Sequence, residues 1–134
     1  MKFYPKESEE QRTLMEWAER MRGSFPELDL LFHIPNGGSR NAIEARHLKE
    51  QGVKPGVPDL FLPVSRGGFF GLFIEMKRQD GGKLSETQTH WIMQLNMQGY
   101  LAGVCAGWEE AARLIISYLK RQKVAEGNRE TVKK

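Results

Sequence analysis

The chain has 134 residues, of which 40% are hydrophobic and 28% are charged, and its formal net charge is +3. This length supports one domain with a single core, and the modest positive charge permits a polyanionic partner without requiring one. The one cysteine, Cys105, excludes an internal disulfide and fits a buried thiol in an apolar run. No apolar segment follows the charged N-terminus or approaches the length of a membrane span, so we expect a cytoplasmic protein.

Residues 8–22 have the pattern of an amphipathic helix. Ser8 with Gln11 three residues later has the form of a capping box. Glu10 falls within the apolar stripe of this helix, which consists of Leu14, Trp17, Ala18 and Met21. A carboxylate in a core-facing stripe is costly unless it is paired or bound to a cation. In the first turn it can also simply complement the helix dipole, and the pattern leaves both readings open.

A short apolar run, residues 30–35, predicts a strand, and the sequence Asn-Gly-Gly-Ser-Arg follows it at 36–40. The spacing of a nucleotide-binding P-loop is missing, which excludes a nucleoside-triphosphate site of that type. Asn36 and Arg40 can contact a nucleic-acid phosphate, Arg40 through its planar guanidinium. A plain turn that caps the next helix explains them equally well. His33, within the run, fits either a structural histidine or a DNA contact.

Residues 40–51 are predicted to form a short helix whose inner positions are Ala42, Ile43, Ala45 and Leu48. Its outer face is basic, and Lys54 lies just beyond its end. A DNA backbone could lie along such a surface, but an ordinary solvated helix face has the same composition.

Residues 52–77 contain the main candidate site of the chain. It contains two apolar runs divided by Arg-Gly-Gly at 66–68, which predicts a hairpin with Ser65 opposite Phe69 and Asp59 opposite Glu75. Since residues i and i+2 of a strand share a face, Glu75 and Lys77 point the same way. The carbonyl of Met76 lies between them.

Two carboxylates and one main-chain oxygen make an incomplete shell for Mg²⁺ or Mn²⁺ that is open to a phosphate. Such a metal activates water for phosphodiester hydrolysis, and a lysine beside it can orient that water or offset developing negative charge. The alternative is a turn acid at Asp59 and an exposed ion pair between Glu75 and Lys77. The clustering of all three at one strand end favours the metal site.

A polar loop that includes Arg78 comes next. A helix follows it and ends near residue 98, and at its start Ser85 and Gln88 form a second capping-box pattern. Gln88 shares a face with Trp91, Ile92 and Leu95, so it can reach the acids or serve only as the cap. Residues 100–106 then predict a buried strand. The helix predicted at 108–120 has Ala111, Leu114, Ile115, Tyr118 and Leu119 as inner positions, and residues 122–134 read as a basic tail outside one domain at 1–121.

Pro58-Asp59 followed by Glu75-Met76-Lys77 resembles the PD-(D/E)xK nuclease superfamily. The similarity extends to His-Ile-Pro-Asn-Gly-Gly at 33–38, Gly-Val-Pro-Asp at 56–59, Ser85 with Gln88 and Trp91, and Gly-Tyr at 99–100. This ordered set resembles the VRR-NUC (virus-type replication-repair nuclease) family, from about residue 7 to residue 119. The resemblance implies an α/β fold with a PD-(D/E)xK nuclease-like core, a small mixed sheet flanked by helices.

The resemblance also implies roles for individual residues. The metal ligands would be Asp59, Glu75, the Met76 carbonyl and a glutamate on the first helix, with Glu10 as the matching position and Glu7 or Glu9 as alternatives. Lys77 would be catalytic, together with the two acids, and Gln88 would belong to the active-site set. Candidate DNA contacts are Asn36, Arg40, Lys54 and Arg78.

Stand-alone members of this family resemble Holliday-junction resolvases, which act as homodimers on branched DNA. We therefore expect a Mg²⁺- or Mn²⁺-dependent DNA endonuclease that forms a homodimer. The alternative is a subunit that keeps the nuclease fold and binds branched DNA without cutting it. A phosphodiesterase acting on small nucleotides is disfavoured because the sequence shows no long lid loop to close a pocket.

Overall fold

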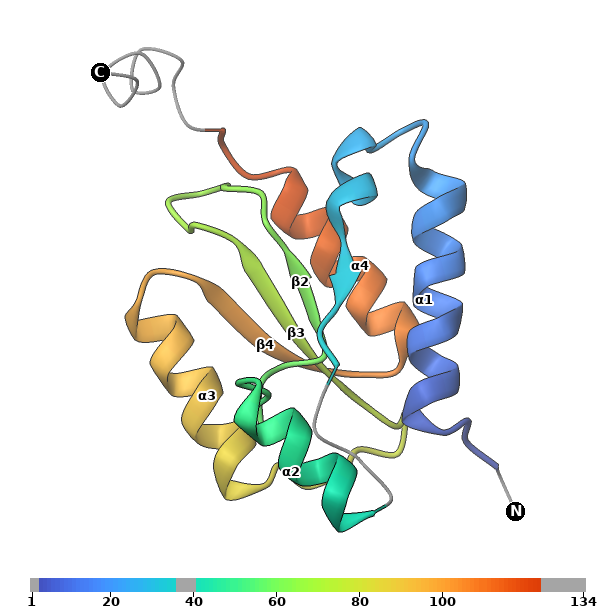
Figure 1. Ribbon diagram of the computed structural model, residues 1–134. Helices are drawn as coiled ribbons and strands as arrows, with labels where there is room; N and C mark the ends of the chain where they lie inside the picture. Colours follow the sequence, from blue (N-terminus) through green and yellow to red (C-terminus); the bar gives the residue numbers. More distant parts are fainter. Residues whose placement is uncertain (1–2, 36–40, 124–134) are drawn as a thin grey trace.

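A computed structural model describes residues 3–35 and 41–123 of the chain. Figure 1 shows a small sheet with helices around it. In chain order the elements are α1 (Glu7–Met21), the short 3-10 helix η1 (Pro26–Leu30), β1 (Phe32–His33), α2 (Ala42–Glu50), β2 (Leu60–Leu62), β3 (Leu72–Lys77), α3 (Glu86–Met97), β4 (Leu101–Ala106) and α4 (Trp108–Leu119).

The four strands form one mixed sheet in the order β1-β2-β3-β4. β2 pairs antiparallel with β1 and with β3, whereas β3 and β4 are parallel. Because parallel neighbours need a crossover, α3 connects β3 to β4 across one face of the sheet. The predicted α/β architecture with a small mixed sheet is confirmed.

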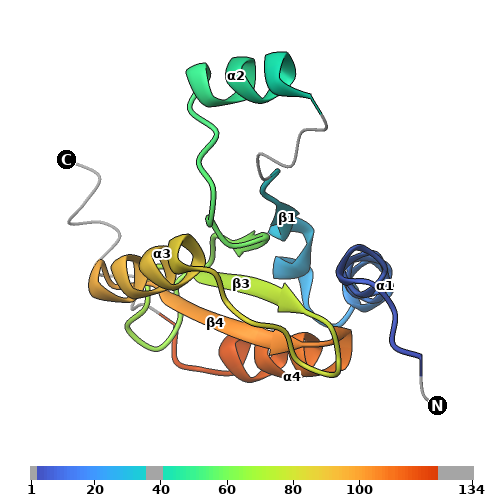
Figure 2. The ribbon, with the colours of Figure 1, turned by 90° about the horizontal axis from the view of Figure 1, so that it is seen from below.

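The hydrophobic core lies between the sheet and the pair α1 and α4. Figure 2 shows α3 and α4 on opposite faces of the sheet. The core side chains include Leu14, Ala18, Leu60, Leu62, Leu72, Ile74, Met76, Cys105, Ile115 and Tyr118. Alternate residues of β3 therefore point to α4, and the residues between them point to the α3 side.

The α3 side of the sheet carries both aromatic and charged side chains. Phe61 stacks on Phe73 with their ring centroids 4.1 Å apart. Glu75 and Lys77 continue the same side of β3, and all six residues of that strand are buried. The acid and the lysine at the end of this central strand are therefore buried, so the alternative of an exposed ion pair between Glu75 and Lys77 is wrong.

The first helix differs from the prediction at its start. Its N-cap is Lys6, with no side-chain cap, so the capping box predicted for Ser8 and Gln11 is wrong. The carbonyl of Lys6 already accepts bonds from the N–H groups of Glu9 and Glu10. Acidic residues in this first turn complement the helix dipole in place of a side-chain cap.

The tip of the β2–β3 hairpin is also shifted by one residue. Arg66, not Ser65, pairs with Phe69. Gly67 and Gly68 both have positive φ, as a two-residue turn of type I′ requires, and this fixes the closing pair. The central register is Leu60 opposite Ile74. Its continuation places Asp59 opposite Glu75, as predicted.

The predicted inner face of α2 is wrong in part, since the helix contains no buried residue and Ile43 is 72% exposed. Figure 2 shows why: α2 stands apart from the sheet, so its apolar positions have little to pack against. The 3-10 helix η1 also occupies the start of the run predicted to be a strand. No helix among the described residues is long and apolar enough to cross a membrane.

Candidate active site

Three segments meet at the C-terminal end of β3. The residue before β2 is Asp59, the end of β3 contributes Glu75 and Lys77, and the first turn of α3 contributes Gln88. Hydrogen bonds and one ion pair join them across the sheet. The predicted cluster of two acids and a lysine is therefore present, and the sheet register and the start of α3 bring it together.

Asp59 is fixed to the neighbouring strand through the backbone. Its Oδ2 accepts a hydrogen bond from the Met76 N–H at 2.7 Å. The N–H and C=O groups of one strand residue point to the same side, so the Met76 carbonyl also faces the Asp59 side of β3. A cation beside Asp59 could therefore reach that carbonyl, as the predicted ligand set requires.

Glu75 is the most perturbed group of the site. It is 1% exposed, and its Oε2 accepts from Gln88 Nε2 at 3.2 Å and lies 3.8 Å from Lys77 Nζ. Burial, with the adjacent Asp59 carboxylate as the next cause, raises the pKa of Glu75 to about 8. Lys77 opposes this shift without cancelling it.

The Glu75 carboxyl lies within hydrogen-bonding reach of Asp59, and its other oxygen accepts from no protein donor. Oε1 is the single buried side-chain nitrogen or oxygen without a hydrogen bond among residues 3–35 and 41–123. An unsatisfied buried carboxylate oxygen is costly. A divalent cation between Asp59 and Glu75 would satisfy that oxygen and offset the repulsion between the two acids, so the donor set fits Mg²⁺ or Mn²⁺.

Lys77 and Gln88 are hydrogen-bonded to each other beside Glu75. Lys77 is 6% exposed, and its Nζ donates to Gln88 Oε1 at 3.1 Å. The same oxygen accepts from the Ser85 N–H, while Ser85 Oγ accepts from the Gln88 N–H. Gln88 thus completes the capping box of α3 and also bridges Lys77 to Glu75. The two readings of Gln88 that the sequence left open are both present.

Glu10 has a buried carboxylate, and each of its two oxygens accepts one hydrogen bond. Gln79 Nε2 donates to its Oε2 at 2.8 Å, and the Trp108 N–H donates to its Oε1 at 3.1 Å. These bonds join α1 to the segment after β3 and to the start of α4. The carboxylate of Glu7, one turn earlier, contributes to the raised pKa of Glu75.

The described residues contain no preformed cage of protein ligands. Within them, no three His, Cys, Asp or Glu side chains are grouped closely enough to hold a metal ion. A cation at Asp59 and Glu75 would therefore complete its shell with the Met76 carbonyl, water and substrate oxygens, which suits Mg²⁺.

Residues 5–109 match the family model of the VRR-NUC domain. The chain belongs to the VRR-NUC family. A solved structure called "VRR_NUC domain protein" is similar over 92% of this chain and 94% of its own, with 32% sequence identity and a TM-score of 0.78. No curated protein sequence matches the chain. The predicted membership is confirmed, and the domain is of the nuclease type that acts on DNA.

The structure describes two of the four predicted DNA contacts of this VRR-NUC domain. Lys54 and Arg78 are exposed, and Arg78 Nε lies 3.5 Å from Asp80 Oδ1. Asn36 and Arg40 lie outside the described residues, as does most of the predicted basic tail. His33 has a structural contact that its position in the sequence left open: its Nδ1 lies 2.8 Å from the Asp59 carbonyl oxygen and steadies the start of β2.

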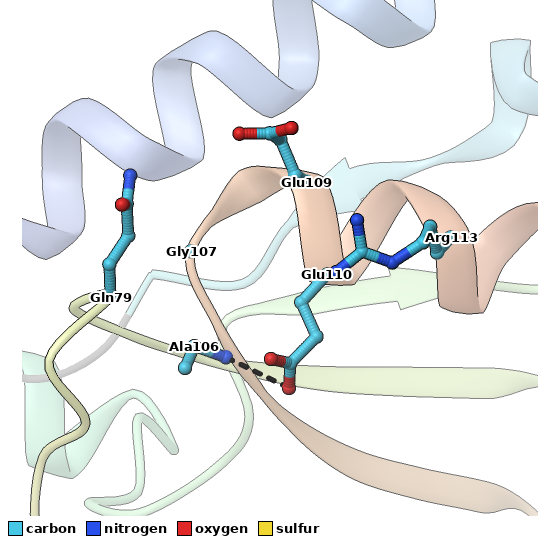
Figure 3. Close-up of a pocket in the computed structure, with 6 residues that line it drawn as sticks. All are labelled: Gln79, Ala106, Gly107, Glu109, Glu110 and Arg113. Atoms are coloured by element: carbon cyan, nitrogen blue, oxygen red, sulfur yellow. Dashed lines mark hydrogen bonds between the residues drawn. The ribbon is translucent and has the colours of Figure 1, made fainter.

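Two hollows are lined by residues that lie close in sequence to those of the site, and local sequence patterns indicate neither because each is lined by segments far apart in the chain. One, of about 290 Å³, lies where β4 passes into α4 (Figure 3) and is lined by Gln79, Ala106, Gly107, Glu109, Glu110 and Arg113. There Glu110 Oε1 accepts from the Ala106 N–H at 3.2 Å, so this acid satisfies an edge-strand donor. The other hollow lies beside Trp91.

Proposed function

We propose that this VRR-NUC domain is a divalent-metal-dependent DNA endonuclease that hydrolyses phosphodiester bonds at the end of β3. The observation that carries the proposal is the close approach of two acids, Asp59 and Glu75, beside Lys77: the Glu75 carboxyl is buried, its Oε1 accepts from no protein donor, and the neighbouring Asp59 raises its pKa. Bound Mg²⁺ or Mn²⁺ would supply a Lewis acid for the phosphate and a water of lowered pKa.

The residues of the chain position the other reactants. Asp59, Glu75 and the Met76 carbonyl would hold the cation. The ammonium of Lys77, kept in place by Gln88 Oε1, would face the scissile phosphate and offset the negative charge that grows on its oxygens as water attacks phosphorus. The attacking water would lose a proton to solvent as its oxygen bonds to phosphorus, the phosphorus–oxygen bond to the leaving group would break, and the leaving oxygen would take a proton from solvent. Gln88 acts as a positioning residue, because it holds both Lys77 and Glu75.

The role of the helix acid is a separate part of the proposal. Glu10 matches the family position for a further ligand. Each of its oxygens accepts one N–H bond and keeps a second lone pair, so Glu10 could bind a cation while Gln79 and the Trp108 N–H hold its carboxylate in place. Glu7 is the alternative, since its charge already acts on Glu75.

The substrate and the assembly are proposed from the family resemblance. Branched DNA is the proposed substrate, and a homodimer would place two sites so that both strands of a junction are cut symmetrically.

The test is incubation with a labelled four-way junction, a 5′ flap and linear duplex, each with Mg²⁺, Mn²⁺ or EDTA. The comparison variants are Lys77→Ala and, as a matched lysine on the exposed loop after β3, Lys83→Ala. We expect metal-dependent cuts that Lys77→Ala abolishes and Lys83→Ala leaves intact, with junction binding retained in both. Tight junction binding without cutting under either metal would overturn the proposal in favour of a noncatalytic DNA-binding subunit.

A further inference from the structure

The hollow beside Trp91 is the larger of these two and has a volume of about 490 Å³, within the range of small-ligand pockets. Three segments line it. The residue after β1 contributes Ile34, α3 contributes Trp91, and the segment between α2 and β2 contributes Gln51, Val53, Lys54 and Val57. Most of this lining is apolar, with a lysine and a glutamine as its polar members.

The residues that line this hollow are close in sequence to residues of the candidate active site. Trp91 follows Gln88 by three residues in α3, so the two side chains are neighbours on one helix face. Val57 precedes Asp59 by two residues. The Ile34 N–H donates to the Asp59 carbonyl at 2.7 Å, which places the end of β1 directly beside the start of β2. The hollow is therefore lined by the same segments that carry Asp59 and Gln88.

The chemistry of the lining fits a nucleobase. The indole of Trp91 offers a broad flat surface for stacking, and the amide of Gln51 can hydrogen-bond a base edge. Lys54 is exposed, so its ammonium can meet the phosphate of the same nucleotide. A base that is paired and stacked inside a duplex cannot enter such a hollow, whereas an unpaired base can.

We propose that the Trp91 hollow binds an unpaired nucleobase next to the scissile phosphate, stacked on the indole and with its phosphate held by Lys54. This inference rests on the proposed nuclease function and narrows its substrate. DNA with an unpaired nucleotide beside the cut, as at a flap or a branch point, is preferred over continuous duplex because one base must leave the stack.

The test measures binding in a Lys77→Ala background, so that cleavage does not interfere. The DNA is a labelled flap with a series of single abasic nucleotides placed on either side of the branch point. We expect one abasic position to lower the affinity about 10-fold for the parent protein and to have no effect once Trp91→Ala is added. Trp91→Phe retains most of the affinity. Met93→Ala, an exposed position of the same helix, behaves as the parent.

Several outcomes decide the proposal. The proposal is overturned if the parent protein binds every abasic DNA as tightly as intact DNA. This comparison uses no substitution at position 91, so it does not depend on whether a Trp91 variant folds. If the losses from the abasic nucleotide and from Trp91→Ala simply add, the base lies elsewhere and the proposal fails. Base-dependent binding in the Lys77→Ala background, together with no cutting by the unaltered protein, supports the hollow and refutes the nuclease. Cutting by the unaltered protein, together with no base dependence of binding, refutes the hollow alone.

Discussion

Replacing Glu75 by glutamine tests the electrostatics of the site in the metal-free protein. The folded protein raises the pKa of Glu75 from 4.5 to about 8, so between these values the native state keeps a proton that the unfolded chain releases. The free energy of unfolding must then fall as the pH rises from about 4.5 to about 8, and level off above that range. Glutamine cannot ionise, so Glu75→Gln lacks this fall.

The size of the effect follows from the same shift. Each tenfold change in proton affinity corresponds to about 1.4 kcal/mol, which gives an upper limit of roughly 4–5 kcal/mol. The variant also removes the carboxylate that lies 3.8 Å from Lys77 Nζ, and the loss of this ion pair offsets part of the stability that the variant gains at high pH. We therefore expect Glu75→Gln to be more stable than the parent by about 2 kcal/mol at pH 9 in EDTA. Near pH 4.5 the two proteins should match to within about 1 kcal/mol.

The assay is urea unfolding of both proteins at several pH values between 4.5 and 9, in EDTA and in Mg²⁺. Mg²⁺ should raise the stability of the parent at pH 9, because it binds the native carboxylates, and should leave Glu75→Gln nearly unchanged. Parallel stability curves for the two proteins in EDTA would refute the assignment of a protonated, buried Glu75.

Three further predictions follow from other contacts. Asp59→Asn keeps an acceptor for the Met76 N–H but loses the negative charge. The Mg²⁺ affinity measured by calorimetry should therefore fall at least about 10-fold. An unchanged Mg²⁺ titration excludes Asp59 as a ligand. Burial raises the pKa of Cys105 to about 12, so a thiol reagent at pH 8 should label the unfolded chain and not the native protein, and rapid native labelling would contradict this. Tyr118→Phe removes the bond from the hydroxyl to the Val64 carbonyl at 2.6 Å and should cost about 1–3 kcal/mol in chemical denaturation, while DNA binding stays the same; a smaller loss means that water reaches the carbonyl.

The sequence by itself determined the features that depend on short-range geometry. The twofold repeat of a strand was enough to place Glu75 and Lys77 on one face. The hairpin pattern gave the pairing of Asp59 with Glu75 from the wrong closing pair, and the register changes by one residue between the observed pair Arg66–Phe69 and β2, which restores that pairing. The capping box of α3 was also readable, since Ser85 and Gln88 are only three residues apart and bond to each other.

Local patterns failed where a neighbouring element decides the outcome. The apolar positions of α2 looked like an inner face, but the helix stands apart from the sheet and Ile43 is exposed. The Ser8 pattern had the form of a cap, but the chain already enters the helix from Lys6. Periodicity reports which side chains share a face and carries no information about what lies opposite.

Only the tertiary structure decided how the site is completed. Glu10 bonds to Gln79 and to the N–H of Trp108, and the second of these contacts spans 98 residues of sequence. The hollow beside Trp91 likewise needs three segments that meet only when β1 pairs with β2 and α3 crosses the sheet. Such contacts depend on the packing of whole elements against one another, so no local pattern encodes them.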